Sequence, residues 1–284
     1  MTLAFRELRY VRCKVDDIAT TADFAEQMFG MMCEGRTETG ALFRADKRFY
    51  SLCIATDMPS AIGFSVGRAA DLDEYAQAFG DAGHDVTWLD GDDASRRIIK
   101  RGISVPTPNG VRLEIVWRHM ESGQPFHGGR HTGLNGFSAV QLACADIDAN
   151  TAFWENVPGL DVSDYAGRAQ FMTIGGSHHQ VALYPSDEDG VLGAIWQVET
   201  LDNVMRHWHY MRDRQVPIAH GPGRQPTSDA VFLSLRTPAG FLMSYATEMS
   251  APPELGPRQF RDEARSHCQW GSPAEMPEFK GERS

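Results

Sequence analysis

The hydrophobic and polar positions of the chain follow the same order in its two halves. A strand-like run leads to Asp17, and a short amphipathic helix then ends near Gly30. The same pattern returns at an offset of about 129 residues, where Asp146 and Gly159 take the corresponding places. Both aspartates are predicted N-caps, because a carboxylate accepts hydrogen bonds from the first free N–H groups of a helix. The chain is therefore predicted to contain an internal repeat.

The repeat continues through the second part of each half. Residues 64–74 match residues 196–204, as a strand that runs into a second helix. Residues 107–115 match residues 237–245, and in both a proline followed two residues later by glycine predicts a tight turn before a closing strand. Each half is therefore predicted to hold two modules of one strand, one helix and further strands.

The domain boundaries follow from the repeat. Residues 1–120 are predicted to form an N-terminal two-module domain, and residues 134–249 a C-terminal one. The glycine-rich polar stretch 121–133 is the predicted linker. Residues 250–284 are rich in proline and charge, so they form either an arm packed on the body or a partly ordered tail.

Composition narrows the class of protein. The 284 residues are 42% hydrophobic and 23% charged, and the net charge is −11. An acidic chain repels phosphate backbones, so no nucleic-acid partner is expected. No apolar run is long enough for a membrane span, and the N-terminus does not resemble a secretory signal, so the expected compartment is the cytoplasm. The basic cluster around Lys100 is interpreted as a solvated face.

The number and spacing of the cysteines argue against disulfide bonds and against a zinc site built from thiolates. The five cysteines are scattered and odd in number, and no two of them are spaced as a CxxC pair. This pattern predicts neither a disulfide framework nor a thiolate zinc site.

The order and spacing of several segments together resemble the type I extradiol dioxygenases of the vicinal oxygen chelate (glyoxalase/bleomycin resistance) superfamily. The resemblance implies an α+β fold with four βαβββ modules in two tandem barrel-like domains, and it implies a homo-oligomer. It also implies that the C-terminal cup is the active site, holding Fe(II) or Mn(II), while the N-terminal cup is empty. The segments are residues 9–17, 43–54, 63–86, 106–117, 133–154, 175–183, 195–204 and 223–246.

The metal ligands that the resemblance implies are missing from the sequence. The two histidine positions are occupied by Ala139 and Gly193, and the glutamate position by Ser244. Alanine and glycine have no donor atom, and a serine hydroxyl is a poor neutral ligand for such a site. Two supporting positions have changed as well, to Gln225 and Ser234. The sequence therefore predicts no cofactor, with Fe(II) or Mn(II) in an unusual site as the alternative.

One functional residue that the resemblance implies is retained. His179, in the stretch 175–183, matches the family's acid/base histidine. A structural role for it stays open. His178 and Tyr165 complete the predicted catalytic group. The predicted substrate-binding residues are Gln141, Arg168, Trp196, Gln225, Ser234, Ser244 and Tyr245.

Other groups are weaker candidates. In the N-terminal cup the corresponding positions are Tyr10, Ile62 or a neighbour, and Glu114, and Glu114 is interpreted as a hydrogen-bonded relic. Positions i and i+2 of a helix point about 200° apart, so His207 and His209 cannot share a metal and are expected on the surface. The linker histidines are expected in solvent; they are His127 and His131.

Three functions follow from these expectations. The first is a metal-independent enzyme of aromatic catabolism, a lyase, isomerase or hydrolase that binds a small aromatic or phenolic compound in a roomy, neutral cup. The second is a ring-cleaving dioxygenase with unusual metal ligation. The third is a protein that binds aromatic ligands without turnover.

Overall fold

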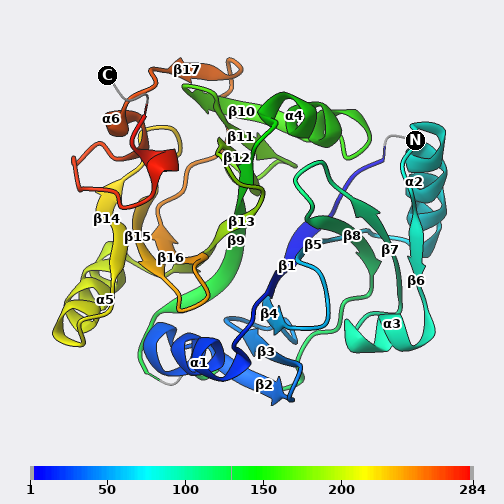
Figure 1. Cartoon of the computed structure of the whole chain (residues 1–284), viewed down its shortest axis with the longest axis horizontal. Helices are drawn as coiled ribbons and strands as arrows, with labels where there is room; N and C mark the ends of the chain where they lie inside the picture. Colours follow the sequence, from blue (N-terminus) through cyan, green and yellow to red (C-terminus); the bar gives the residue numbers. More distant parts are fainter. Residues whose placement is uncertain (1–2, 129, 282–284) are drawn as a thin grey trace.

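Two curved sheets lie side by side, and most of the helices lie on their outer sides (Figure 1). The computed structural model describes residues 3–128 and 130–281. The N-terminal sheet has eight strands in the order β2-β3-β4-β1-β5-β8-β7-β6, and the C-terminal sheet has nine in the order β14-β15-β16-β13-β9-β12-β11-β10-β17. The first strands of the two domains, β1 and β9, run close to each other at the centre of the molecule.

The N-terminal sheet and its helices are built from the first 117 residues. The strands are β1 Glu7–Lys14, β2 Met32–Arg36, β3 Gly40–Arg44, β4 Leu52–Ala55, β5 Ala61–Ser65, β6 Thr87–Leu89, β7 Arg101–Pro106 and β8 Arg112–Trp117. The helices are α1 Ile18–Asp23, the π-helical η1 Phe24–Phe29, α2 Ala69–Asp81 and α3 Gly91–Arg96.

The C-terminal sheet begins after the segment 118–133. Its strands are β9 Leu134–Cys144, β10 Asp161–Ala166, β11 Ala169–Thr173, β12 Val181–Pro185, β13 Gly190–Val198, β14 Ile218–Arg224, β15 Val231–Arg236, β16 Leu242–Thr247 and β17 Arg258–Phe260. Its helices are α4 Ile147–Asn156, α5 Leu201–Asp213, α6 Ala264–His267 and the 3-10 helix η2 Pro277–Phe279.

The four modules repeat one strand, one main helix and three strands, so the predicted α+β class and βαβββ arrangement are confirmed. The predicted caps are present, because Asp17 accepts from the backbone N–H of Thr20 at 3.1 Å and Asp146 from that of Ala149 at 2.9 Å. The turns before the closing strands also repeat. In each, the N–H of a threonine, Thr107 or Thr237, is bonded to the carbonyl four residues later.

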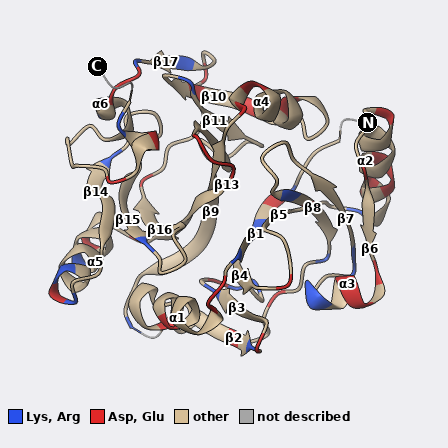
Figure 2. Ribbon diagram, in the orientation of Figure 1, with Lys and Arg blue, Asp and Glu red and all other residues tan. Residues whose placement is uncertain are grey.

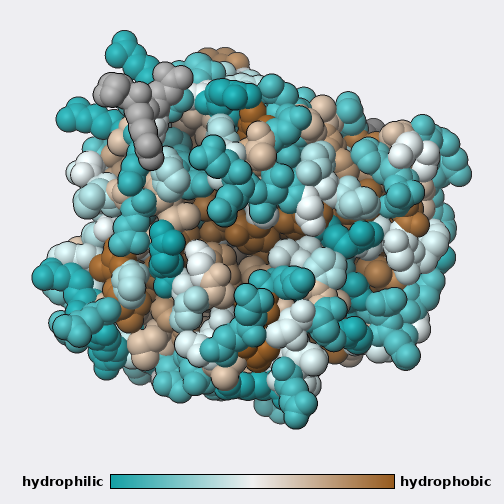
Figure 3. Space-filling view, in the orientation of Figure 1, coloured by the Kyte–Doolittle hydropathy of each residue, from teal (hydrophilic) through white to brown (hydrophobic). Residues whose placement is uncertain are grey.

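Charge is distributed unevenly over the two domains (Figure 2). Acidic side chains are prominent on α2, whereas α5 carries two arginines and two aspartates. Figure 3 shows that one face of the molecule is mostly hydrophilic at its edge, with hydrophobic side chains nearer its centre. No helix among the described residues is long and apolar enough to span a membrane.

The C-terminal segment forms an arm on the second domain. Its strand β17 pairs in parallel with β10 and extends the sheet. Further along, the N–H of Gln269 bonds the carbonyl of Arg224 at 2.8 Å, and the N–H of Glu275 bonds that of Ala219 at 2.8 Å. Of the two predicted states, residues 250–281 therefore show the packed arm.

Candidate functional site in the C-terminal cup

One row of side chains crosses the inner face of the C-terminal sheet. Ala139 on β9 is paired with Ile195 on β13, and Ile195 is paired with Ser244 on β16. The row continues through Ser234 on β15 to His220 on β14. Residues paired across neighbouring strands project to the same face. Three of the expected positions therefore lie in one row with a histidine that the sequence analysis did not single out.

The second implied ligand position needs a correction. Gly193 was aligned with it, but the strand register places Ile195 in the row with Ala139 and Ser244, and Gly193 two residues away on the same face. A Cβ at Gly193 would stand 2.9 Å from Oε1 of Gln141, so the glutamine side chain occupies that space. Neither residue offers a metal ligand.

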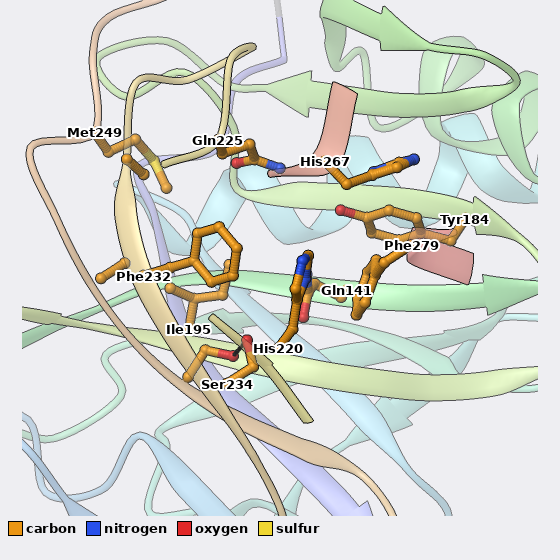
Figure 4. A pocket seen from close by; sticks show the side chains of 13 residues that line it. Gln141, Tyr184, Ile195, His220, Gln225, Phe232, Ser234, Met249, His267 and Phe279 are labelled. Carbon is orange, nitrogen blue, oxygen red and sulfur yellow. Dashed lines mark hydrogen bonds between the residues drawn. The ribbon is translucent and has the colours of Figure 1, made fainter. Parts of the chain in front are cut away.

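The cup encloses a small cavity, shown in Figure 4. Its volume is about 30 Å³, which is room for about two water molecules. The expected roomy cup is therefore wrong for this conformation, because large side chains from the sheet and the arm fill it. The lining residues are Gln141, Tyr184, Ile195, His220, Gln225, Ala230, Phe232, Ser234, Ser244, Ala246, Met249, His267 and Phe279.

His220 lies between two aromatic rings in this cavity. Its ring centroid is 4.8 Å from that of Phe232, nearly edge-on, and 5.3 Å from that of Phe279, nearly parallel. Burial, assisted by the neighbouring His267, lowers the pKa of His220 to about 4. The imidazole is therefore neutral at pH 7, so that one ring nitrogen accepts and the other donates a hydrogen bond.

Tyr184 provides a second polar group in the wall. Burial raises its pKa, so the phenol stays protonated at neutral pH, and the side chains of Gln141 and Gln225 bond its hydroxyl. Gln225 is itself oriented by Ser228, whose hydroxyl donates to its Oε1 at 2.7 Å. Oε1 of Gln141 is buried and has no hydrogen-bond partner among the described residues. This orphaned acceptor marks a place for a donor group inside the cup.

The arm closes the cup with an aromatic ring and a second histidine. Phe279 from η2 contacts Tyr184 edge-on with 5.1 Å between ring centroids. His267 from α6 also lines the cavity, and burial lowers its pKa to about 4. Its Nδ1 is buried, and within the described part of the chain it has no partner. The cup is therefore incomplete without residues that follow the predicted domain.

The predicted catalytic pair stands behind the wall of the cup. His178 and His179 are both buried, and their Nδ1 atoms lie 3.0 Å apart. His178 Nε2 lies 2.8 Å from Asp164 Oδ2, and Arg258 of the arm holds the same carboxylate at 2.6 Å. Phe171 contacts the ring of His179 and that of Tyr184. Neither histidine lines the cavity.

The other predicted residues divide according to strand alternation. The structure brings Gln141, Gln225, Ser234 and Ser244 together in the cavity. Successive residues of a strand point to opposite faces. Ile195 and Ser244 line the cavity, so the residues that follow them, Trp196 and Tyr245, point away from it.

The neighbours point towards the first domain. Trp196 donates from Nε1 to Ser51 Oγ at 3.0 Å, and Tyr245 donates from its hydroxyl to the carbonyl of Phe29 at 2.7 Å. Two further predicted residues lie outside the cavity: Tyr165 is partly exposed on β10, and Arg168 is an exposed residue beside Asp148 at 3.3 Å.

The N-terminal cup is filled by an ion-pair network. Glu114 accepts from the hydroxyl of Tyr10 at 2.6 Å, from Arg12 at 2.7 Å and from Arg97 at 2.9 Å. Burial opposes ionisation, but the two guanidinium groups hold the pKa of Glu114 below its usual value. The interpretation of Glu114 as a hydrogen-bonded residue is therefore confirmed. The neighbour of Ile62 in this row is Gly63, which is covered by Tyr10.

The helix histidines differ from the expectation in one case. His209 is exposed, but His207 is buried, because it bonds the carbonyl of Thr132 at 2.8 Å and stacks on Tyr245. All five cysteines are free, as expected.

Comparisons with known proteins agree with this fold. Residues 131–245 match the family model described as Glyoxalase/Bleomycin resistance protein/Dioxygenase superfamily. These residues form a domain of that superfamily, and the chain is closely similar to the type I extradiol dioxygenases. The resemblance inferred from the sequence is confirmed.

Two curated relatives match most of the chain. Biphenyl-2,3-diol 1,2-dioxygenase of Paraburkholderia xenovorans is 28% identical over 86% of this chain and 88% of its own length. The 3-methylcatechol 2,3-dioxygenase of Pseudomonas putida is 26% identical over 86% of this chain and 90% of its own.

Solved structures share the same fold over almost the whole chain. A halotolerant catechol dioxygenase has a TM-score of 0.88 and 18% identity, covering 98% of this chain and 97% of its own. The Mn(II)-bound glyoxalase from Novosphingobium aromaticivorans has a TM-score of 0.85 and 19% identity, covering 99% and 95%. The fold is thus shared with these two proteins, one of which is bound to Mn(II).

These comparisons contradict the expectation of a protein without a cofactor. Relatives that match most of the chain are dioxygenases, and one structural neighbour is bound to Mn(II). The implied ligand positions nevertheless do not fit a site of two histidines and one carboxylate, since Ala139, Ile195 or Gly193, and Ser244 occupy them. Among the residues that the structure describes, no three His, Cys, Asp or Glu side chains gather as a metal site. A metal bound by this chain would therefore be held by residues other than these.

Proposed function

We propose that this protein is an enzyme of aromatic catabolism that binds a small aromatic or phenolic compound in the C-terminal cup. One observation carries the proposal: a neutral buried histidine, His220, stands inside an aromatic-walled cavity at the inner face of an extradiol-dioxygenase-like sheet. Apolar walls with a few convergent polar groups are typical of small-molecule sites. The relatives named above act on biphenyl-diol and methylcatechol, which supports the same class of substrate.

The proposed chemistry is proton transfer on the bound ring. A neutral imidazole accepts the proton of a phenol, and the phenolate that forms stabilises the imidazolium in return. Tyr184, held as a phenol, and the amides that bond it are placed to donate hydrogen bonds to the developing oxyanion. The reaction class is a lyase, isomerase or hydrolase. His179 keeps its predicted acid/base role only if a substrate reaches it past Phe171.

The experiment compares two matched variants, His220→Ala and His179→Ala, in a turnover screen of phenols, catechols and aryl ketones. We expect His220→Ala to lower kcat by about 10²- to 10⁴-fold, the usual contribution of a positioned acid/base group, and His179→Ala to have a smaller effect. Equal turnover by the wild type and His220→Ala contradicts the role of His220. A larger loss in His179→Ala transfers the role to the buried pair.

A second function, ring cleavage of catechols by oxygen, is favoured by the relatives. It requires a metal held by residues other than the family's triad positions. Oxygen uptake with 3-methylcatechol and biphenyl-2,3-diol, after loading with Fe(II) or Mn(II), separates the two functions. Oxygen uptake with a stoichiometric metal in elemental analysis supports ring cleavage. Turnover without oxygen uptake supports proton-transfer chemistry.

A further inference from the structure

A second hollow lies in the N-terminal domain, and one of its lining residues, His119, contacts Tyr10 of the N-terminal cup. Its volume is about 920 Å³, against about 30 Å³ for the C-terminal cavity. It is formed by the start of β1, the segment leading into α2 and the end of β8. Six basic side chains line it, with two acidic ones, Glu7 and Glu121. The basic residues are Arg6, Arg9, Lys47, Arg68, Lys100 and Arg118.

Local ion pairs leave part of this positive charge uncompensated. Arg9 contacts Glu7 at 2.6 Å, and Lys47 contacts Glu121 at 3.0 Å. In residues 3–128 and 130–281, no carboxylate stands within ion-pair distance of Arg6, Lys100 or Arg118. Since the whole chain carries a net charge of −11, this concentration of cations is a local exception, and a hollow focuses its field.

Rigid contacts fix the polar part of the hollow. Arg9 is 97% buried, and it donates from Nε to Nδ1 of His119 at 3.2 Å and from Nη2 to the carbonyl of that residue at 3.2 Å. Arg118 has a left-handed backbone with φ of 56°, and its guanidinium lies 4.6 Å above the ring of Trp117. A non-glycine residue in this region stays there only because its surroundings fix it.

The hollow also presents apolar surface beside the charges. Met120 is 57% exposed, which is unusual for a large hydrophobic side chain, and Trp117 is partly exposed next to it. An inorganic anion makes no use of such a surface, whereas an aromatic acid rests its ring on it and directs its carboxylates to the cations.

We propose that this hollow binds an aromatic dicarboxylate. Its two carboxylates contact Arg6, Lys100 and Arg118, and its ring packs against Met120 and Trp117. The site is separate from the C-terminal cup and does not depend on the function proposed there.

The test is isothermal titration of the full chain at low ionic strength with three probes: phthalate, benzoate and inorganic phosphate. We expect phthalate to bind about tenfold or more tightly than either, which corresponds to about 1.4 kcal/mol, because its second carboxylate adds charge-assisted hydrogen bonds and its ring adds apolar contact. The variant Lys100→Glu/Arg118→Glu should weaken phthalate by about tenfold or more. The milder pair Lys100→Gln/Arg118→Gln repeats the test if the charge reversal impairs folding.

Matched controls decide the location. The variant Arg206→Glu/Arg214→Glu changes the net charge equally, in α5 and just after its end, and should bind phthalate as the wild type does. The variant His220→Ala should do the same. If the Arg206→Glu/Arg214→Glu variant weakens phthalate binding equally, binding depends on net charge alone. If His220→Ala weakens it, phthalate binds in the C-terminal cup. Either result contradicts the proposal. Phosphate binding as tight as that of phthalate, or no saturable binding of phthalate at millimolar concentration, also overturns it.

Discussion

The two cups of this molecule place different side chains on the same three positions. In the N-terminal cup the paired residues of the row are Tyr10, Gly63 and Glu114, and in the C-terminal cup they are Ala139, Ile195 and Ser244. The large and small residues have changed places between the first two strands. The third position is charged in one cup and neutral in the other.

This difference determines what each cup is able to do. The carboxylate of Glu114 accepts hydrogen bonds from two arginines and a tyrosine. The N-terminal cup is therefore a structural core with buried ions. Among the described residues, the side chains of the C-terminal row make one hydrogen bond, from Ser244 to Ser234 at 2.8 Å, and Gln141 Oε1 has no partner. A neutral cup with unused hydrogen-bonding capacity is suited to a guest, whereas a satisfied ion-pair network is not.

The largest effect on stability expected of a single substitution comes from breaking the N-terminal network. Glu114→Gln leaves Arg12 buried without its counter-charge, whereas Arg97 keeps an ion pair with the exposed Asp93 at 3.0 Å. Removal of one partner of a buried pair destabilises by about 3–5 kcal/mol. Chemical denaturation measures this loss of unfolding free energy. Asp148→Asn, at an exposed ion pair with Arg168, is the control and should change stability little. A small loss in Glu114→Gln means that the network does not hold this cup together.

The next effect is a pH dependence that originates mainly in the C-terminal domain. His207, His220 and His267 have their pKa lowered to about 4 by burial, whereas an unfolded imidazole titrates near 6.5. The unfolded chain binds more protons between these values, so stability is complete above pH 6.5 and falls as the pH decreases towards 4. Each histidine contributes a slope of about 1.4 kcal/mol per pH unit. Urea midpoints across this range measure it, and a flat profile down to pH 4.5 contradicts neutral buried histidines.

A smaller effect concerns the size of the guest. Phe279→Ala removes the ring that stacks beside His220, so the cup gains space at the arm. We expect the affinity ratio of biphenyl-2,3-diol to catechol to rise by about tenfold, the range that a hydrophobic pocket achieves by size alone. Leu255→Ala, at an exposed position of the arm, should leave the ratio unchanged. An unchanged ratio in Phe279→Ala means that the arm does not limit the substrate.

The smallest effect on stability is expected from Ser244, in the row of paired side chains that crosses the C-terminal cup. Ser244→Ala removes the hydrogen bond to Ser234, which contributes about 1 kcal/mol. Thermal unfolding of this variant beside Glu114→Gln compares one position in the two cups. A loss as large as that of Glu114→Gln shows that both cups are equally structural.

The fold was largely predictable because it repeats. The spacing from Asp17 to Gly30 and from Asp146 to Gly159 marks the first module of each half, and the threonine turns mark the last strands. The inward positions Gln141, Gln225, Ser234 and Ser244 followed from the resemblance. Trp196 and Tyr245 were included with them although they alternate with inward residues, and strand periodicity alone excludes them.

Other parts of the site were not predictable from the pattern. The pairing of β14 with β15 shifts register on both sides of His220, between Ile218 and His220 and between His220 and Gly223. Such bulges change which side chains point inward. His267 and Phe279 come from an arm without hydrophobic periodicity, whose position depends on tertiary contacts such as Arg258 with Asp164. Local sequence carries no information about such long-range docking.

The most direct test of the two-cup comparison is a crystal structure with catechol bound. We predict that the ring lies in the C-terminal cup, with an oxygen in hydrogen-bond contact with His220 and with Phe279 displaced from its position beside that histidine. The network of Glu114 in the N-terminal cup should be unchanged. Catechol bound elsewhere, with the C-terminal cup still closed by Phe279, would contradict the assignment of this cup as the substrate site.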